Sequence, residues 1–235
     1  MASRIDDDQT DAHRSIFERL ADDICRRAFS SPEAIAYEMT IAPALSRALL
    51  PHLQTRITGG MVLDVGCGGG RIASAMGQPP LTGVIGIDPS QSQVRSLTRR
   101  TRSNSVVWAT RARAESLPFA DDSFDHVFSS CAWKHWPDPG RGIAECARVT
   151  RPGGSLVIIE IDGSSTRPTF ERFARETRFP PGLRKAYVRF AMRTVVGVAP
   201  NVRQLTQSFE GLNLGLSEVN GLGDSPFLLA EATVY

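Results

Sequence analysis

Short apolar runs alternate along the chain with segments in which apolar residues recur every three or four positions. The runs that predict buried strands are 62–65, 84–87, 106–109, 124–129 and 155–161. Between two of them, Val94 and Leu97 supply the inner face of a helix whose arginines face water. This alternation predicts an α/β fold in which a doubly wound, mostly parallel sheet carries helices on both sides.

Other segments depart from this alternation. Residues 13–50 have helical spacing and follow a short polar tail, and residues 162–200 predict helices inserted after the fifth apolar run. Two further strands, Leu212–Val219 and Phe227–Tyr235, are separated by a turn rich in glycine and proline. They predict an antiparallel hairpin at the end of the sequence.

The stretch 61–71, MVLDVGCGGGR, joins the first strand to the next helix through a turn crowded with glycine. Glycine lacks a Cβ, so such a turn can adopt positive φ and let a ligand touch the backbone. Strand-to-helix turns of this kind are typical of nucleotide-like ligands, because exposed N–H groups favour negative charge. No Lys-Ser/Thr pair follows the glycines, which argues against a phosphate-cradling P-loop.

Two carboxylates flank this turn. Asp64 lies inside the first strand, where its charge would repel a pyrophosphate but could orient a cationic ligand. Asp88 ends the second strand, about 20 residues after the glycines, at the distance from which an acidic residue accepts both ribose hydroxyls. Together with the turn, the two carboxylates indicate an adenosine ligand without phosphates.

Four blocks carry a resemblance to a known family. They are VLDVGCGGGR at 62–71, GIDPS at 86–90, AESLPFADDSFDHVFSS at 114–130 and HWPDPGRGIAECARVTRPGG at 135–154. In this order and spacing the chain resembles the class I S-adenosylmethionine-dependent methyltransferases, within them the small-molecule branch that includes quinone-biosynthesis enzymes. The resemblance implies S-adenosyl-L-methionine as cofactor, a seven-stranded Rossmann-like sheet and transfer of a methyl group to a small-molecule acceptor.

The resemblance also implies which residues bind the cofactor. They are Asp64, Gly66, Cys67, Gly68, Asp88, Pro89, Ala114, Glu115 and Ser130. In the family, an Asp commonly precedes the alanine of the adenine loop and bonds the adenine amino group. Here that position is Arg113, so the contact with the adenine amino group is in doubt. A hydrogen bond from the backbone N–H of Ala114 to the adenine ring would still be available. Arg71 has two open roles, since it could reach the methionine carboxylate or cap the turn.

His135 follows the fourth strand and is the candidate catalytic residue. Its ordinary pKa lies near neutrality, which suits removal of a proton from an acceptor hydroxyl or an acidic carbon. The alternative is that His135 fixes the loop together with Trp136 and Pro137, because histidine is common at this place in the family. The roles of base and scaffold both stay open. The cysteines are widely separated and form no CxxC pair, so no metal site is indicated.

The family pattern divides the chain into four parts. They are an N-terminal tail and helical cap (1–50), a cofactor-binding core (51–161), a helical lid (162–200) and the end of the core with the terminal antiparallel hairpin (201–235). The apolar face of the lid would enclose an acceptor or pack on the sheet; it consists of Phe170, Phe173, Phe179, Tyr187, Phe190 and Met192. Its basic face, with Lys185, Arg189 and Arg193, would attract an anionic acceptor or simply be solvated.

Composition and charge add limits to this picture. A hydrophobic share of 41% and a charged share of 22% are typical of soluble globular proteins. No apolar run approaches the roughly 20 residues that span a bilayer, and the N-terminus is too acidic for a signal peptide. A cytoplasmic protein without a membrane span is therefore expected. The acceptor and the atom methylated cannot be read from the sequence, and a homodimer is left open.

Two arginine-rich stretches, 95–113 and 167–193, raise a nucleic-acid methyltransferase as an alternative, because they could follow a phosphate backbone. The fourth strand ends in SSCAWKHW, however, where amino methyltransferases of nucleic-acid bases usually carry an Asn/Asp-Pro-Pro-aromatic clamp. No nucleic-acid partner is therefore expected. A further alternative is a relative that binds the cofactor without transferring its methyl group, which the Arg113 departure allows.

Overall fold

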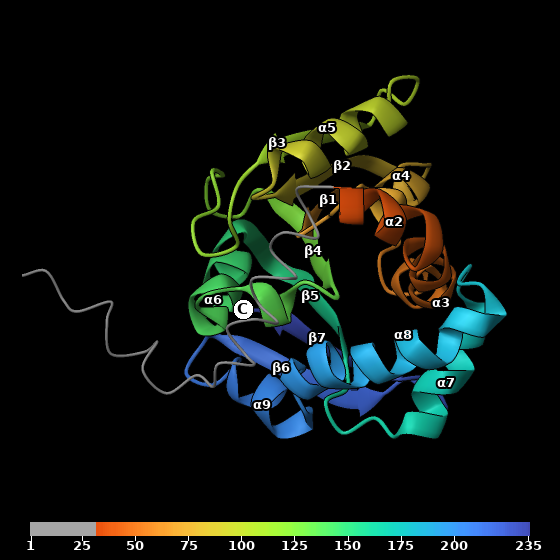
Figure 1. The fold of residues 1–235 in the computed structure, drawn as a ribbon. Coiled ribbons are helices and arrows are strands. Elements are labelled where there is room, and N and C mark those ends of the chain that lie inside the picture. Colours follow the sequence, from red (N-terminus) through yellow and green to blue (C-terminus); the bar gives the residue numbers. More distant parts are fainter. Residues whose placement is uncertain (1–31) are drawn as a thin grey trace, which may run out of the picture.

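The computed structural model describes residues 32–235, which form a twisted sheet flanked by helices (Figure 1). Within that range the sheet has seven strands in the order β3-β2-β1-β4-β5-β7-β6. Their bounds are β1 Gly60–Val65, β2 Leu81–Asp88, β3 Val107–Arg111, β4 Phe124–Ser130, β5 Thr150–Ile161, β6 Leu214–Gly221 and β7 Phe227–Val234. Strands β1 to β5 pair in parallel, whereas β7 is antiparallel to both β5 and β6. The predicted mostly parallel sheet with its terminal antiparallel hairpin is confirmed.

Helices cover both faces of the sheet. Their bounds are α2 Pro32–Thr40, α3 Ala42–Gln54, α4 Arg71–Met76, α5 Gln91–Arg100, η1 Trp133–His135, α6 Pro139–Val149, α7 Arg167–Glu176, α8 Pro181–Thr194, η2 Val196–Val198 and α9 Val202–Gln207. One buried cluster joins α3, α4, α5, α7 and α8 to the sheet, and a second joins α6 and α9 to the opposite face. This two-faced burial explains why the apolar strand runs are continuous rather than alternating.

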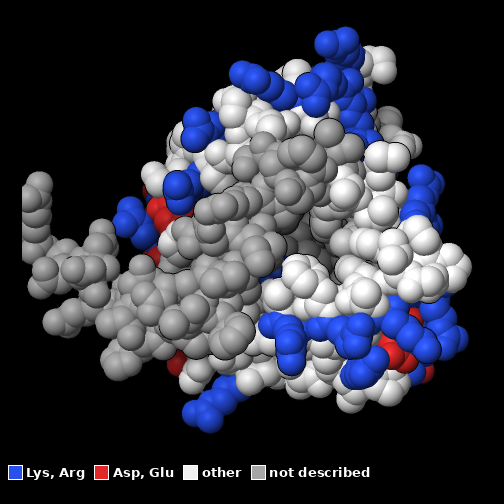
Figure 2. Space-filling view, viewed as in Figure 1, with Lys and Arg blue, Asp and Glu red and all other residues white. Residues whose placement is uncertain are grey.

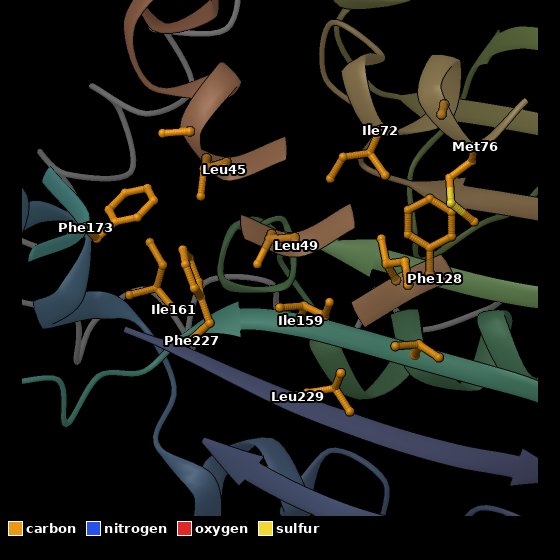
Figure 3. Packing of buried hydrophobic residues seen from close by; sticks show 14 of the residues in the cluster. Leu45, Leu49, Ile72, Met76, Phe128, Ile159, Ile161, Phe173, Phe227 and Leu229 are labelled. Carbon is orange, nitrogen blue, oxygen red and sulfur yellow. The ribbon is translucent and has the colours of Figure 1, made fainter. Parts of the chain in front are cut away.

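The α3 side of the core is shown in Figure 3. Leu45 and Leu49 of α3 point towards the end of the sheet, where Ile159 and Phe227 lie. Each fully buried aliphatic or aromatic side chain of this kind contributes about 1.5 to 3 kcal/mol relative to its exposure in water. The cluster therefore fixes α3 next to the ends of β5 and β7, close to the ligand-binding edge of a parallel sheet.

The start of β5 differs from the prediction. The fifth strand was predicted over 155–161, but β5 already begins at Thr150, which pairs with Phe124 of β4. The next pair is His126 with Ser155, so the intervening residues of β5 bulge out of register. Gly153 adopts a φ of 80° within this bulge, a conformation that glycine accepts at no steric cost.

The segment predicted as a lid contains α7 and α8, but its aromatic residues divide between core and surface. Phe170 and Phe173 are 1% and 6% exposed, whereas Phe190 is 49% exposed and therefore does not belong to an inner apolar face. Lys185, Arg189 and Arg193 are exposed, and Figure 2 shows Lys and Arg side chains along the surface over α8. That this segment roofs an acceptor stays a prediction.

Two other expectations concern the limits of the description. The helical spacing predicted for residues 13–31 lies outside the described residues. Within residues 32–235, no helix combines the length and apolar character that a membrane crossing requires.

Candidate functional site

A cavity of about 720 Å³ lies at the carboxyl ends of β1, β2 and β4, where ligands bind in open α/β sheets. The glycine turn, the end of β2, the 111–115 loop and the segment after β4 form its walls together with α2 and α3. Most residues predicted to bind the cofactor line it, as does the candidate catalytic histidine: Gly66, Cys67, Gly68, Asp88, Pro89, Ala114, Glu115, Ser130 and His135. The fold therefore brings together four sequence blocks that are distant along the chain.

The glycine turn is held tightly against the end of β2. The N–H groups of Gly66 and Cys67 both donate to the carbonyl oxygen of Ile87, at 2.9 and 2.8 Å. Gly66 has a φ of 79°, and a Cβ there would clash with the Cβ of Ala132. Glycine is thus required at position 66 by the backbone conformation and by the close approach of the segment after β4.

Asp88 presents its carboxylate at the cavity wall. Its Oδ2 accepts from the N–H of Gly68 at 3.1 Å, and its Oδ1 accepts from the N–H of Ser90 at 2.8 Å. Burial raises the pKa of this carboxyl, and the two N–H groups partly oppose that shift. An ionised carboxylate has about four acceptor positions, so two remain for hydroxyl groups of a ligand.

Asp64 is placed differently from the prediction that it contacts a ligand. It is 1% exposed, and it is absent from the described residues that line the cavity. Burial raises the pKa of Asp64 well above its usual range; the neighbouring Asp88 raises it further, and the N–H of Ala73 lowers it. Its Oδ1 has no hydrogen-bond partner among the described residues. Asp64 therefore supports the start of α4 behind the glycine turn.

The segment after β4 brings His135 to the cavity. Cys131 adopts a φ of 55°, a conformation uncommon outside glycine, and η1 follows at Trp133–His135. The Nζ of Lys134 donates to the carbonyl of Cys131 and to Oε1 of Glu160, both at 2.8 Å. The Lys134 and Glu160 side chains are 4% and 0% exposed. This buried ion pair ties the segment to β5 and thereby holds the backbone beside His135.

Neither cysteine of the cavity wall has the properties of a nucleophile. Burial raises the pKa of Cys131 to about 12, and it raises that of Cys67 as well, so both carry neutral thiols at neutral pH. Glu160 at the end of β5 is the buried partner of Lys134.

The loop expected to cup an adenine ring is attached to α6. The carbonyl of Glu115 accepts from Nε of Arg141 at 2.8 Å, and its Oε1 accepts from the N–H of Asp138 at 3.3 Å. Ala114 is buried, whereas Arg113 is exposed on the cavity rim. The adenine amino contact that an acidic residue would give at position 113 thus has no counterpart in this side chain.

Helices α2 and α3, which lie largely within the segment predicted as a helical cap, contribute to the wall. Tyr37 lines the cavity, and burial raises its pKa well above the usual range. Glu38 was missed because nothing in its local sequence distinguishes it from a surface glutamate. It pairs with Arg71, whose Nε lies 3.1 Å from Oε2 of Glu38 and whose Nη2 donates to the Glu38 carbonyl at 2.7 Å.

Comparison with known proteins finds methyltransferases among the similar sequences. A family described as "Methyltransferase domain" matches residues 63–158. The chain is 40% identical over 106 residues to methyltransferase GfsG of Streptomyces halstedii, covering 44% of this chain and 38% of that protein. It is 35% identical over 116 residues to the ubiquinone/menaquinone biosynthesis C-methyltransferase UbiE of Geobacter sulfurreducens, covering 46% and 44%. The chain spans about half or less of the length of the first curated relatives it matches.

Solved structures share the fold at low sequence identity. A SAM dependent methyltransferase from Aquifex aeolicus aligns with a TM-score of 0.65 and 17% identity, covering 87% of this chain and 99% of that one. The [4+2]-cyclase SpnF aligns with a TM-score of 0.60 and 19% identity, covering 80% and 81%. These likenesses establish a Rossmann-like methyltransferase fold for the described residues.

Proposed function

We propose that this chain is a class I S-adenosylmethionine-dependent methyltransferase and that it transfers the methyl group of S-adenosyl-L-methionine to a small-molecule acceptor. The observation that carries the proposal is the cavity in which a bare glycine turn, the Asp88 carboxylate and His135 meet at the carboxyl ends of β1, β2 and β4. The names of relatives such as GfsG and the quinone methyltransferase support an acceptor among quinones or specialised metabolites.

The cavity residues suit the cofactor. Asp88 has two acceptor positions left for the ribose hydroxyls, and the backbone N–H of Ala114, which lines the cavity, would donate to an adenine ring nitrogen. Gly68 lines the cavity and has open space around the position that a Cβ would take, so a ligand can approach its backbone closely. When bound, S-adenosyl-L-methionine supplies a methyl group on a sulfonium, which is an intrinsically good leaving group.

The protein mainly has to orient the acceptor and exclude water. Proximity and orientation supply roughly 7 to 11 kcal/mol in favourable cases, so little further machinery is required. Leu45 and Leu49 of α3 give the cavity an apolar wall against water. An acceptor that must lose a proton would pass it to an imidazole nitrogen of His135, whereas an acceptor with a free lone pair would need no base.

Each of the four predicted parts of the chain has a proposed role. Residues 51–161 would bind the cofactor, residues 1–50 would cap it, and α7 and α8 within 162–200 would roof the acceptor. Residues 201–235 would complete the sheet. A cytoplasmic location and a homodimer complete the proposal.

A labelling experiment tests the function. The protein is incubated with methyl-labelled S-adenosyl-L-methionine and a metabolite extract from its source, and the labelled product is identified by mass spectrometry. We expect label in a small molecule. Label in RNA or DNA would instead support the nucleic-acid alternative, and cofactor binding without transfer to any pool would support the non-catalytic one.

His135→Ala decides between base and scaffold once the product is known. If His135 is a base, the transfer rate of His135→Ala should fall tenfold or more while its affinity for the cofactor stays the same. His52→Ala serves as the matched control, because His52 lies on α3 and does not line the cavity. A near-normal rate for His135→Ala would leave His135 as scaffold.

A further inference from the structure

One carboxylate on α2 binds two arginines directly above the glycine turn. Oε2 of Glu38 lies 3.1 Å from Nε of Arg71 and 3.0 Å from Nη2 of Arg100. Arg100 also donates from Nε to the carbonyl of Gly69 at 2.9 Å. Figure 1 shows α2 beside the connection from β1 to α4, as these bonds require. The α2 helix is therefore joined to the glycine turn through Glu38.

Gly69 explains how closely this carboxylate approaches the turn. The backbone at Gly69 does not adopt a positive φ, so its conformation does not require glycine. A Cβ at this position would instead clash with Oε1 of Glu38. The absence of a side chain at position 69 thus makes room for the carboxylate of a residue more than thirty positions earlier in the chain.

Glu38 and Arg71 keep binding capacity for a ligand. Both line the cavity, with side chains 18% and 30% exposed. Oε2 of Glu38 carries both ion pairs, whereas Oε1 accepts none of the hydrogen bonds found among the described residues. Arg71 uses Nε and Nη2, which leaves Nη1 outside those bonds. A cavity wall with a carboxylate oxygen and a guanidinium side by side suits a ligand that carries an ammonium group next to a carboxylate.

We propose that Glu38 and Arg71 bind the amino-acid end of the cofactor, a site that rests on the proposed function. Oε1 of Glu38 accepts from the ammonium group, and the Arg71 guanidinium donates to the carboxylate. Glu38 is then a specificity-determining residue supplied by α2. It favours ligands with a free α-amino group over ligands that share only the adenosine part.

The test is a cycle of two proteins and two ligands, measured by calorimetry. The proteins are the unaltered chain and Glu38→Gln, and the ligands are S-adenosylhomocysteine and its analogue with hydrogen in place of the amino group. We expect the unaltered chain to bind S-adenosylhomocysteine at least tenfold more tightly than the analogue. In Glu38→Gln that ratio should fall to about twofold or less. A Glu38→Gln protein that keeps the full tenfold preference would overturn the assignment.

Two controls separate direct contact from indirect effects. Binding of 5′-methylthioadenosine, which lacks the amino-acid end, should be unchanged in Glu38→Gln and thereby shows that the adenosine site is intact. Arg100→Gln loosens α2 without altering Oε1 of Glu38, so it should keep the preference for the amino group. Loss of the preference in Arg100→Gln as well would show that Glu38 acts only by docking α2, which also overturns the inference.

The outcomes for this inference and for the proposed function are distinguishable. If neither S-adenosylhomocysteine nor 5′-methylthioadenosine binds the unaltered chain, the proposed function fails. If both bind but the unaltered chain binds S-adenosylhomocysteine no more tightly than the analogue without the amino group, the proposed function stands and the role of Glu38 fails. Should Glu38→Gln lose its fold by circular dichroism, Glu38→Asp replaces it. The shorter side chain should weaken the preference, and an undiminished preference would overturn the proposal.

Discussion

Asp64 and Asp88 lie near the carboxyl ends of neighbouring strands of one sheet, but they differ in burial and surroundings. Asp88 lies at the cavity wall with two backbone N–H groups that favour its ionised form. Asp64 lies behind the turn, and its carboxyl is raised in pKa by burial and by the charge of Asp88. The sequence could place both carboxylates beside the glycine turn. It could not say which of them faces the cavity, because that depends on side-chain orientation near the end of each strand.

At this scale, Asp88→Ala should weaken S-adenosyl-L-methionine binding by roughly 1 to 3 kcal/mol, the range for lost hydrogen bonds to a charged group. Isothermal calorimetry measures the change. Asp224→Ala is the control, since Asp224 is exposed and lies away from the cavity, and its affinity should match the unaltered chain. An unchanged affinity in Asp88→Ala would refute the assignment of this residue to the ribose.

The raised pKa of Asp64 gives a prediction for stability against pH. The folded chain holds the proton on Asp64 at pH values where the unfolded chain has already released it. The contribution of Asp64 to the free energy of unfolding is therefore most favourable at low pH, and it is lost as pH rises above the unfolded pKa through the folded one.

The variant Asp64→Asn removes this titration but keeps a similar shape. We expect its stability, relative to the unaltered chain, to increase between pH 5 and pH 8 in urea denaturation. The comparison cancels other titrating groups such as Asp88, provided that their surroundings stay the same. A constant stability difference across this pH range would contradict the raised pKa.

Among the elements, the segment after β4 shows how distant parts of the chain position a site. The conformation of Cys131 and the start of η1 are held by the buried Lys134–Glu160 pair, whose partners are 26 positions apart. No spacing rule in the sequence points to this pair, because a lysine between aromatic residues and a glutamate in a strand each have ordinary surface interpretations. The pair is recognisable only once β4 and β5 lie side by side.

Breaking this buried pair should be costly. Lys134→Met or Glu160→Leu alone leaves an uncompensated buried charge, so each should lower the free energy of unfolding by about 3 to 5 kcal/mol. The double variant removes both charges and should recover most of that loss. Urea denaturation of the three variants measures both effects. Single variants that cost less than about 1 kcal/mol would show that the charges are solvated rather than buried.

Helices α7 and α8 illustrate the limit of helical periodicity. Val188 and Ala191 of α8 are buried, and Tyr187 stacks on Phe179 with ring centroids 4.4 Å apart. Phe190 lies two positions after Val188, which is about 200° around the helix, and it is therefore exposed. The sequence found both helices but assigned Phe190 to the wrong face, because an aromatic residue at the edge of a stripe fits either side.

Two phenylalanines make a matched test of this division. Phe173→Ala should cost about 3 to 5 kcal/mol of stability, because Phe173 packs edge-to-face on Phe227 in the core. Phe190→Ala should stay within about 0.5 kcal/mol, as surface substitutions usually do. Chemical denaturation of both variants gives the comparison. Equal costs would mean that α8 turns its other face towards the sheet.

For the whole molecule, the positions of the strands along the chain, the mostly parallel sheet and its ligand-binding edge could be predicted because they depend on repeated local patterns. The apolar runs located the strands, and the four matched blocks placed the cavity at their carboxyl ends. The wall formed by α2 and α3 could not be predicted in the same way, since the position of Glu38 depends on a missing Cβ at Gly69 and on two arginines elsewhere. Such contacts are long-range and leave no periodic signal.

The position of β7 between β5 and β6 constrains the order in which the sheet can assemble. Strand β6 precedes β7 in the sequence, but β7 is its only hydrogen-bonded neighbour in the described sheet. The two must therefore attach as one unit, or β7 must insert before β6 can join. Pulse-labelled hydrogen exchange during refolding should accordingly never protect the amides of 214–221 ahead of those of 227–234.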